Sequence, residues 1–352
     1  MSIVRYSIKK LSCIILSITI LFLTLSCCAK EKIDIKEDTS PYTTIIESDN
    51  TETSNEELST VETTAVSTTF PESIKASTTV QSESELPTKN HAEKNISYGI
   101  LFDVNNNKVL FSKNADKKVY PASLTKLVTA CTALQYVPID IVFTVGSEQS
   151  LVKPESSLCL IKRGHKLTLY DLLCGMLISS GNDAAYTIAV NTARYIYKDQ
   201  ILNDDQAVKI FCHLMNDFAQ SIGMTNSHFT NPDGWDNTEQ YTTVNDLLKL
   251  ALYSNKNSTL CSITSCEKKH VVFESGQNIT WTNTNKLLDK SSKYYYPYAV
   301  GMKTGTTLNA GKSLIASASK DGKAAIAIIM KCETEEQRYT SAIHLLDKVL
   351  KS

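Results

Sequence analysis

Apolar residues between positions 96 and 350 recur at two different spacings. In the middle of this range they lie three or four positions apart, which is typical of the buried face of an α-helix. Near both ends they alternate with polar residues, which is typical of a half-buried strand. The helical spacing predicts a helix that begins near Pro121 and further helices over residues 169–178, 183–197 and 207–222, with a last amphipathic helix around residues 343–350.

The two-residue spacing predicts strands at both ends of this range. Two lie at the start, over residues 96–102 and 109–111, and three lie near the end, over residues 298–307, 313–319 and 324–330. Asp321-Gly322, between the last two, is a typical hairpin turn. Strands at both ends with helices between them predict an α+β fold with one five-stranded antiparallel sheet, closed by both ends of the chain.

The first thirty residues follow a third pattern. Basic residues within the first ten positions precede an apolar run over residues 11–25, which is typical of a secretory signal. The run is shorter than the roughly twenty residues of a membrane-spanning helix. It ends at Ser26-Cys27-Cys28, which resembles a bacterial lipobox. We therefore predict a lipoprotein-type signal peptide over residues 1–27, with Cys27 as the lipid attachment site on the outer face of the cytoplasmic membrane. Attachment at Cys28, simple cleavage and an uncleaved anchor are the alternatives.

Residues 28–94 have the composition of a flexible stalk. Ser, Thr and Glu dominate this segment, glycine is absent, and Tyr42 and Phe70 are its only aromatic residues. Such a segment buries too little apolar surface to offset its ordering entropy, so we predict disorder. The remaining residues, 95–352, form the predicted folded domain.

Several function classes are disfavoured by composition. The net charge of −1 provides no basic surface for nucleic acid. Neither Cys-x-x-Cys nor His-Glu-x-x-His spacing occurs, so we expect no metal and no cofactor. Gly-x-Ser-x-Gly, the elbow that carries a serine nucleophile in α/β-hydrolases, is also missing.

The helix that begins near Pro121 carries the first candidate site. Ser123 and Lys126 lie one turn apart on the same face of this helix. A serine becomes a useful nucleophile when a neighbouring base takes its proton, and a lysine with a depressed pKa can do so. Ser-x-x-Lys is short and often occurs by chance, so the pair requires support from the rest of the chain.

Two further motifs supply that support. Ser180 and Asn182 lie in the loop between two predicted helices, where a hydroxyl can relay a proton and an amide can hold a substrate carbonyl. Lys303 lies on a predicted strand between Gly301 and Gly305, which leave room for another group to approach. Its ammonium can neutralise an anionic substrate, and the neighbouring hydroxyls of Thr304 or Thr307 can donate hydrogen bonds to a carboxylate.

The three motifs resemble those of penicillin-binding proteins and serine β-lactamases in order and in structural context. They are most similar to the low-molecular-mass D-alanyl-D-alanine carboxypeptidases, which are serine peptidases that trim peptidoglycan. The similarity runs from about residue 96 to residue 350 and includes Gly223-Met-Thr-Asn226, Asn231-Pro-Asp-Gly234 and Thr282-Asn-Thr-Asn-Lys286. Asp233 is a departure, because the family often has a histidine there.

The resemblance implies a β-lactamase/transpeptidase-like fold, in which helices flank the sheet and form an additional all-helical subdomain. It implies that Ser123 is the acylated nucleophile, Lys126 its base, and Ser180 and Asn182 the relay and amide-binding groups. It implies a pocket for the substrate carboxylate and an oxyanion site formed by backbone N–H groups of Ser123 and Thr306. The pocket residues would be Lys303, Thr304, Thr307 and, from the last helix, Arg338.

The implied substrate is a peptidoglycan stem peptide that ends in D-Ala-D-Ala, and β-lactams are the implied inhibitors. One alternative is a class A β-lactamase, which needs a glutamate-held water. The Glu-x-x-x-Asn pattern between Ser180 and Lys303, Glu274 to Asn278, lies in an expected hairpin that turns at residues 275–276. The other alternative is a non-catalytic penicillin-binding or sensor module.

Overall fold

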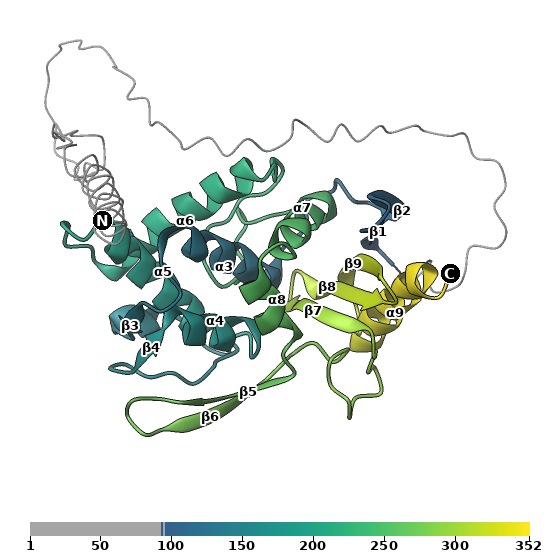
Figure 1. Ribbon diagram of the computed structural model, residues 1–352. Helices are drawn as coiled ribbons and strands as arrows, with labels where there is room; N and C mark the ends of the chain where they lie inside the picture. The colour runs from purple at the N-terminus through teal and green to yellow at the C-terminus, as the bar shows by residue number, and fades with distance from the viewer. Residues whose placement is uncertain (1–92, 94–95) are drawn as a thin grey trace, which may run out of the picture. The chain divides into compact units, whose positions relative to one another are not determined.

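The computed structural model describes residue 93 and residues 96–352 (Figure 1). The predicted signal peptide, the predicted lipid-attachment residue Cys27 and all of the predicted stalk except Glu93 lie outside the described residues. Within the described part of the chain, no helix has the length and apolar character required to span a membrane.

A five-stranded antiparallel sheet joins the two ends of the described chain, as predicted. The strand order is β2-β1-β9-β8-β7. In β1–β9 pairing, Tyr98 lies opposite Met330 and Asp103 lies opposite Ala325. The bounds are Tyr98–Asp103 for β1, Lys108–Lys113 for β2, Ala299–Thr307 for β7, Gly311–Lys320 for β8 and Lys323–Cys332 for β9. The predicted hairpin turn at Asp321-Gly322 joins β8 to β9, and both of its residues have positive φ.

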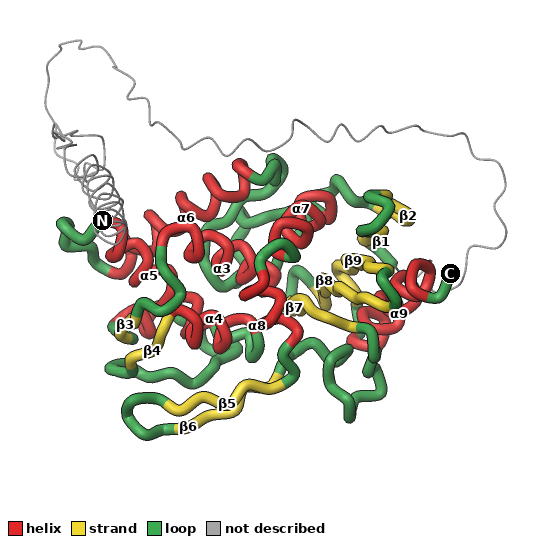
Figure 2. The backbone as a smooth tube through the Cα atoms, in the orientation of Figure 1, coloured by secondary structure: helices red, strands yellow, loops and turns green. Residues whose placement is uncertain are grey.

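The two faces of the sheet contact different helices (Figure 2), so the apolar/polar alternation expected for residues 324–330 is absent from β9. On β9, Ile328 and Met330 belong to the large core beneath the helical region. Ile329, between them, belongs to a second core that includes Leu345 and Leu346 of α9, Glu335–Leu350. Alternate side chains of a strand point to opposite faces, so β9 is apolar on both sides.

The helical region contains the helices that the sequence predicted and two that it did not. The predicted helices are α3 (Thr125–Tyr136), α4 (Leu169–Leu177), α5 (Asn182–Ile196) and α6 (Asp204–Ser221). The sequence did not predict α7 (Val244–Ser254) and α8 (Ser258–Ser265). α8 is rich in serine and threonine, which have low helix propensity, and it is held by burial of Leu260 and Ile263.

Smaller elements complete the fold. Short strands β3 (Val142–Thr144) and β4 (Lys166–Thr168) pair with each other, and so do β5 (Lys268–Val272) and β6 (Asn278–Thr282). The β5–β6 hairpin turns at residues 275–276, as expected, with Gly276 at φ +80°. Single 3₁₀ turns, η1 (Ala122–Leu124) and η2 (Ser147–Leu151), precede α3 and follow β3.

Candidate active site

Ser123 and Lys126 are in contact, as their spacing predicted. Ser123 lies in η1, and the α-helix itself begins two residues later, at Thr125. Lys126 is 0% exposed, and its Nζ donates hydrogen bonds to Oγ of Ser123 at 2.8 Å, Oδ1 of Asn182 at 2.7 Å and the main-chain oxygen of Asp233 at 2.7 Å. Three acceptors match the three protons of an ammonium group, so the side chain is fully bonded in its charged form.

Burial makes Lys126 a better base than a solvent-exposed lysine. Desolvation lowers its pKa from 10.5 to about 8, and the carboxylates of Asp233 and Asp183 oppose this shift. At pH 7 about a tenth of such a group is the neutral amine. The amine can accept a proton from Ser123, which the exposed form of a lysine does far less often.

The loop between α4 and α5 connects Lys126 to a second buried lysine. Lys303 of β7 is 1% exposed, and its Nζ donates hydrogen bonds to Oγ of Ser180 at 2.9 Å and to the main-chain oxygen of Thr304 at 3.1 Å. Ser180 has a φ of +63°, and Asn182, two residues later, contacts Lys126. The loop therefore brings the hydroxyl of Ser180 into contact with Lys303 and the amide of Asn182 into contact with Lys126. Burial lowers the pKa of Lys303 well below its ordinary value, and the charges of Lys126 and Arg338 add to this shift.

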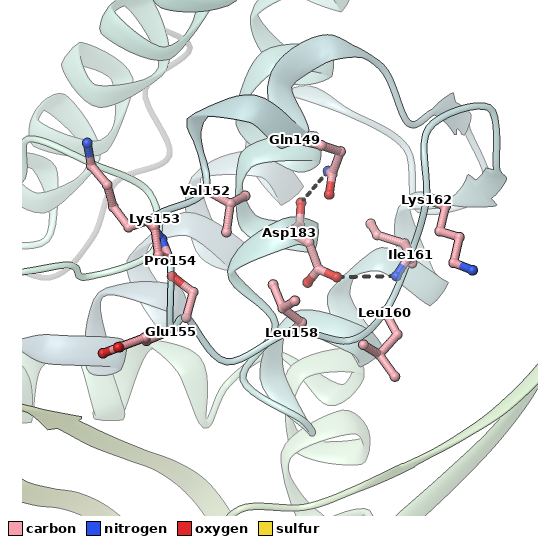
Figure 3. A pocket seen from close by; sticks show the side chains of 11 residues that line it. Gln149, Val152, Lys153, Pro154, Glu155, Leu158, Leu160, Ile161, Lys162 and Asp183 are labelled. Atoms are coloured by element: carbon pink, nitrogen blue, oxygen red, sulfur yellow. Dashed lines mark hydrogen bonds between the residues drawn. The ribbon is translucent and has the colours of Figure 1, made fainter.

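A segment that the sequence analysis did not assign, residues 152–162, forms one wall beside Asn182. Asp183 accepts hydrogen bonds from the main-chain N–H groups of Cys159 at 2.9 Å and Ile161 at 3.2 Å, and the N–H of Asn182 donates to the oxygen of Ser157 at 2.8 Å. Figure 3 shows Asp183 at the centre of this segment. The feature of the sequence that could have indicated this interaction is Asp183, an acidic residue in the first turn of α5.

The same segment lies between two cavities. One, of about 410 Å³, is lined by Val152, Leu158, Leu160 and other residues in Figure 3. The other, of about 450 Å³, is a cleft that contains Ser123 and Asn182. Ser156 and Glu155 line both. The cleft is completed by residues 233–236 and 306–309, on a loop and at the end of β7.

The three threonines predicted to bind the substrate differ in exposure and in hydrogen-bond partner. Thr306 is exposed in the cleft, and its Oγ1 accepts a hydrogen bond from Nη1 of the buried Arg338 at 3.3 Å. The Thr307 hydroxyl also lines the cleft, but it donates to Oδ1 of Asp236 at 2.7 Å. Thr304 is buried, and its hydroxyl is 2.7 Å from that of Thr284.

Fold and site together define the β-lactamase/transpeptidase-like class: a five-stranded sheet with a helical region, a Ser-x-x-Lys turn, a Ser-x-Asn loop and a Lys-Thr-Gly strand. The sequence model described as D-alanyl-D-alanine carboxypeptidase matches residues 83–334, and the chain belongs to this family.

Individual relatives agree with this assignment. The chain is 29% identical over 268 residues to the D-alanyl-D-alanine carboxypeptidase DacC of Escherichia coli, covering 70% of this chain and 59% of the relative. It is 31% identical over 250 residues to a D-alanyl-D-alanine carboxypeptidase of Streptomyces, covering 68% and 81%. The crystal structure of a Streptomyces DD-transpeptidase is similar with a TM-score of 0.65 and 29% identity, covering 72% of this chain and 95% of that one. The chain spans about 60% of the length of DacC and of DacF from Bacillus subtilis, which is 27% identical.

Proposed function

We propose that this protein is a serine-type D-alanyl-D-alanine carboxypeptidase, which removes the terminal D-alanine from peptidoglycan stem pentapeptides and is acylated by penicillins. The observation that carries the proposal is the 2.8 Å contact between Oγ of Ser123 and Nζ of Lys126, a buried lysine whose pKa is lowered to about 8. This contact pairs a nucleophile with a base, and it opens onto the cleft that contains Ser123.

In the proposed acylation step, the amine of Lys126 takes the proton from Ser123 as Oγ attacks the carbonyl carbon of the penultimate residue. The backbone N–H groups of Ser123 and Thr306 stabilise the oxyanion. The C–N bond to D-alanine then breaks, and the proton that Lys126 took from Ser123 passes through the hydroxyl of Ser180 to the leaving nitrogen; Lys303, whose Nζ is 2.9 Å from Oγ of Ser180, holds that hydroxyl in place. Water then attacks the carbonyl carbon of the resulting ester and gives a proton to the amine of Lys126. Lys126 passes this proton to Oγ of Ser123 as the C–O bond breaks, and the shortened peptide leaves with a new terminal carboxyl group.

The carboxylate of the terminal D-alanine is proposed to bind where positive charge converges on β7. Lys303 and Arg338 are both buried, and Arg338 contacts Thr306 in the cleft wall. Hydroxyls of Thr304, Thr306 and Thr307 are the proposed hydrogen-bond donors. An arriving carboxylate stabilises the ammonium form of Lys303, so anion binding and protonation of this lysine are coupled.

The site is proposed to work outside the cytoplasmic membrane. The support is the sequence pattern over residues 1–27 and the Ser/Thr/Glu-rich segment 28–94, which together describe a lipid-anchored enzyme with a long stalk. Radiolabelled fatty acid incorporated into the full chain, and lost in Cys27→Ser, tests the anchor. Label that is retained in Cys27→Ser and lost in Cys28→Ser would assign the anchor to Cys28.

The catalytic proposal is tested by mass spectrometry of a stem pentapeptide ending in D-Ala-D-Ala after incubation with the full chain. Loss of one alanine is expected, and Ser123→Ala should abolish both this loss and covalent labelling by a fluorescent penicillin. Cross-linked peptide would indicate a transpeptidase. Turnover of nitrocefin at hundreds per second, as a β-lactamase reaches, or no labelling of the unmodified chain, would refute the proposal.

A further inference from the structure

The carboxylate of Asp233 is buried beside the Ser123–Lys126 pair, although Asp233 belongs to none of the three motifs. It is 1% exposed. Its Oδ2 accepts a hydrogen bond from Nδ2 of Asn182 at 2.6 Å, and its Oδ1 accepts one from the main-chain N–H of Trp235 at 3.2 Å. Its main-chain oxygen accepts a hydrogen bond from Lys126 at 2.7 Å. Asp233 therefore contacts both Lys126 and the amide that Lys126 contacts.

Asp233 favours the orientation of the Asn182 amide in which its oxygen faces Lys126. A carboxylate only accepts hydrogen bonds, so it binds the NH₂ end and leaves Oδ1 toward Nζ of Lys126. The other neighbour of that NH₂ group is Oγ of Ser156, at 3.0 Å. A hydroxyl both donates and accepts, so Ser156 tolerates either orientation of the amide.

The carboxylate of Asp233 satisfies the two donors that reach this side chain with separate oxygens. Asn182 and Trp235 each present an N–H, one to each oxygen of Asp233. An asparagine has one acceptor oxygen, so its NH₂ group would face one of these two donors. Replacement by asparagine therefore removes the charge and also one hydrogen bond.

The charge of Asp233 acts on Lys126 within a crowded set of ionisable groups. Asp233 and Asp183 raise the pKa of Lys126 against the lowering by burial, and Cys159 acts in the same direction as the two carboxyls. Burial raises the pKa of Asp233 itself, while the charge of Lys126 lowers it. The other groups that face this cluster come from the segment 152–162, α5, α6 and β7, and they are Lys153, Tyr186, Cys212 and Lys303.

We propose that Asp233 is a positioning residue for acylation of Ser123: it orients the amide of Asn182 toward Lys126 and, through its charge, sets how much of Lys126 is present as amine. This inference rests on the function proposed above. It makes two opposite predictions for one substitution. Loss of the charge increases the amine fraction at a given pH, and loss of the orientation lowers the rate that the amine form supports.

The test is the pH dependence of acylation by a fluorescent penicillin in the full chain, in Asp233→Asn and in a matched control. The control is Asp246→Asn, because Asp246 is also 1% exposed and accepts hydrogen bonds from Asn226 and Ser227 at 2.8 Å each. For Asp233→Asn we expect the acid limb of the profile to move to lower pH by about one unit. We expect the plateau rate at high pH to fall about tenfold. The control should keep the profile of the unmodified chain.

An unchanged acid limb in folded Asp233→Asn, or the same shift in the control, would overturn the inference. Carboxyl ¹³C NMR of the unmodified full chain gives a reading that does not depend on any variant. Asp233 should be ionised at pH 7, and a protonated carboxyl there would also overturn the inference. If the unmodified chain is not labelled at all, the proposed function fails instead, and the NMR measurement still reports on Asp233.

Discussion

Gly234 is the position where a single methyl group should most directly affect Ser123, the proposed nucleophile. It has a φ of +89°, and a Cβ added there would lie 1.9 Å from the main-chain oxygen of Ala122 and 2.9 Å from the nitrogen of Ser123. Gly234→Ala therefore forces apart the loop that carries Asp233 and the turn that carries the nucleophile. Gly276, in the β5–β6 hairpin, is a matched control, because its φ is +80° and nothing lies within 4 Å of its added Cβ.

Both substitutions place alanine at a positive φ, but only Gly234→Ala also creates a steric overlap. Alanine at a positive φ costs about 1 kcal/mol at either position. At Gly234 the Ala122 oxygen must also retreat by about 1.5 Å to reach an ordinary contact, and such overpacking costs about 1–3 kcal/mol. We expect Gly276→Ala to lower the free energy of unfolding by about 1 kcal/mol and Gly234→Ala to lower it by about 2–4 kcal/mol.

Gly234→Ala and Gly276→Ala should differ more in their rate of labelling than in their free energy of unfolding. A displacement of about 1 Å in a reacting group can lower a rate by about a hundredfold. Urea denaturation measures the stability of both variants, and the rate of labelling by a fluorescent penicillin measures the position of Ser123. The reasoning is refuted if Gly234→Ala is labelled as fast as Gly276→Ala, because the turn would then have absorbed the methyl group without moving the nucleophile.

Three further outcomes follow from charges in the cleft. Labelling of the unmodified chain should rise about tenfold per pH unit and level off above about pH 8, because the amine of Lys126 is the proposed base and its pKa is about 8; a flat profile from pH 6 to 9 would contradict this. Arg338→Met should raise the KM for the pentapeptide about tenfold with little change in kcat, since the guanidinium bonded to Thr306 is proposed to support binding of the substrate carboxylate; a fall in kcat alone would contradict it. Asp236→Asn keeps an acceptor for the hydroxyl of Thr307 but removes a negative charge that would repel the carboxylate of the substrate. Steady-state kinetics should therefore show a KM about fivefold lower, and an unchanged KM would exclude this repulsion.

The five strands of the sheet and most of the helices could be predicted from the sequence, because apolar spacing reports on which face of an element is buried, whereas α7 and α8 were not. The five strands and their closure by both chain ends follow from this spacing, and the turn at Asp321-Gly322 follows from its residue types. The start of the Ser123 helix was less predictable. Ala122 has a φ of +49°, which a non-glycine residue rarely adopts, and the residues 122–124 form a 3₁₀ turn instead of the first turn of an α-helix. In this conformation Ala122 packs against Gly234 and Gly305, and the spacing of apolar residues does not predict such a tertiary contact.

Local spacing also predicted the Ser123–Lys126 contact, whereas the longer contacts depended on the fold. Ser180 and Lys303 are separated by 123 positions, and only the resemblance in motif order indicated that they meet. Thr307 was predicted to donate to a substrate carboxylate, and in the structure its hydroxyl donates to Asp236, 71 positions away. Its role in substrate binding stays a prediction.

The burial of two lysines in one site has a physical consequence that neither motif indicates by itself. The charge of Lys126 lowers the pKa of Lys303, and burial lowers both. The carboxylate of a bound substrate would pair with Lys303 and stabilise its ammonium form. Because two neighbouring cations repel, a charged Lys303 lowers the pKa of Lys126. Binding of an anionic peptide end should therefore favour the amine form of Lys126 at the moment when Ser123 must lose its proton. A peptide amide, which lacks that charge, should be a poorer acyl donor than the matching acid even at equal occupancy of the cleft, and single-turnover acylation of the two ligands at saturation measures the difference.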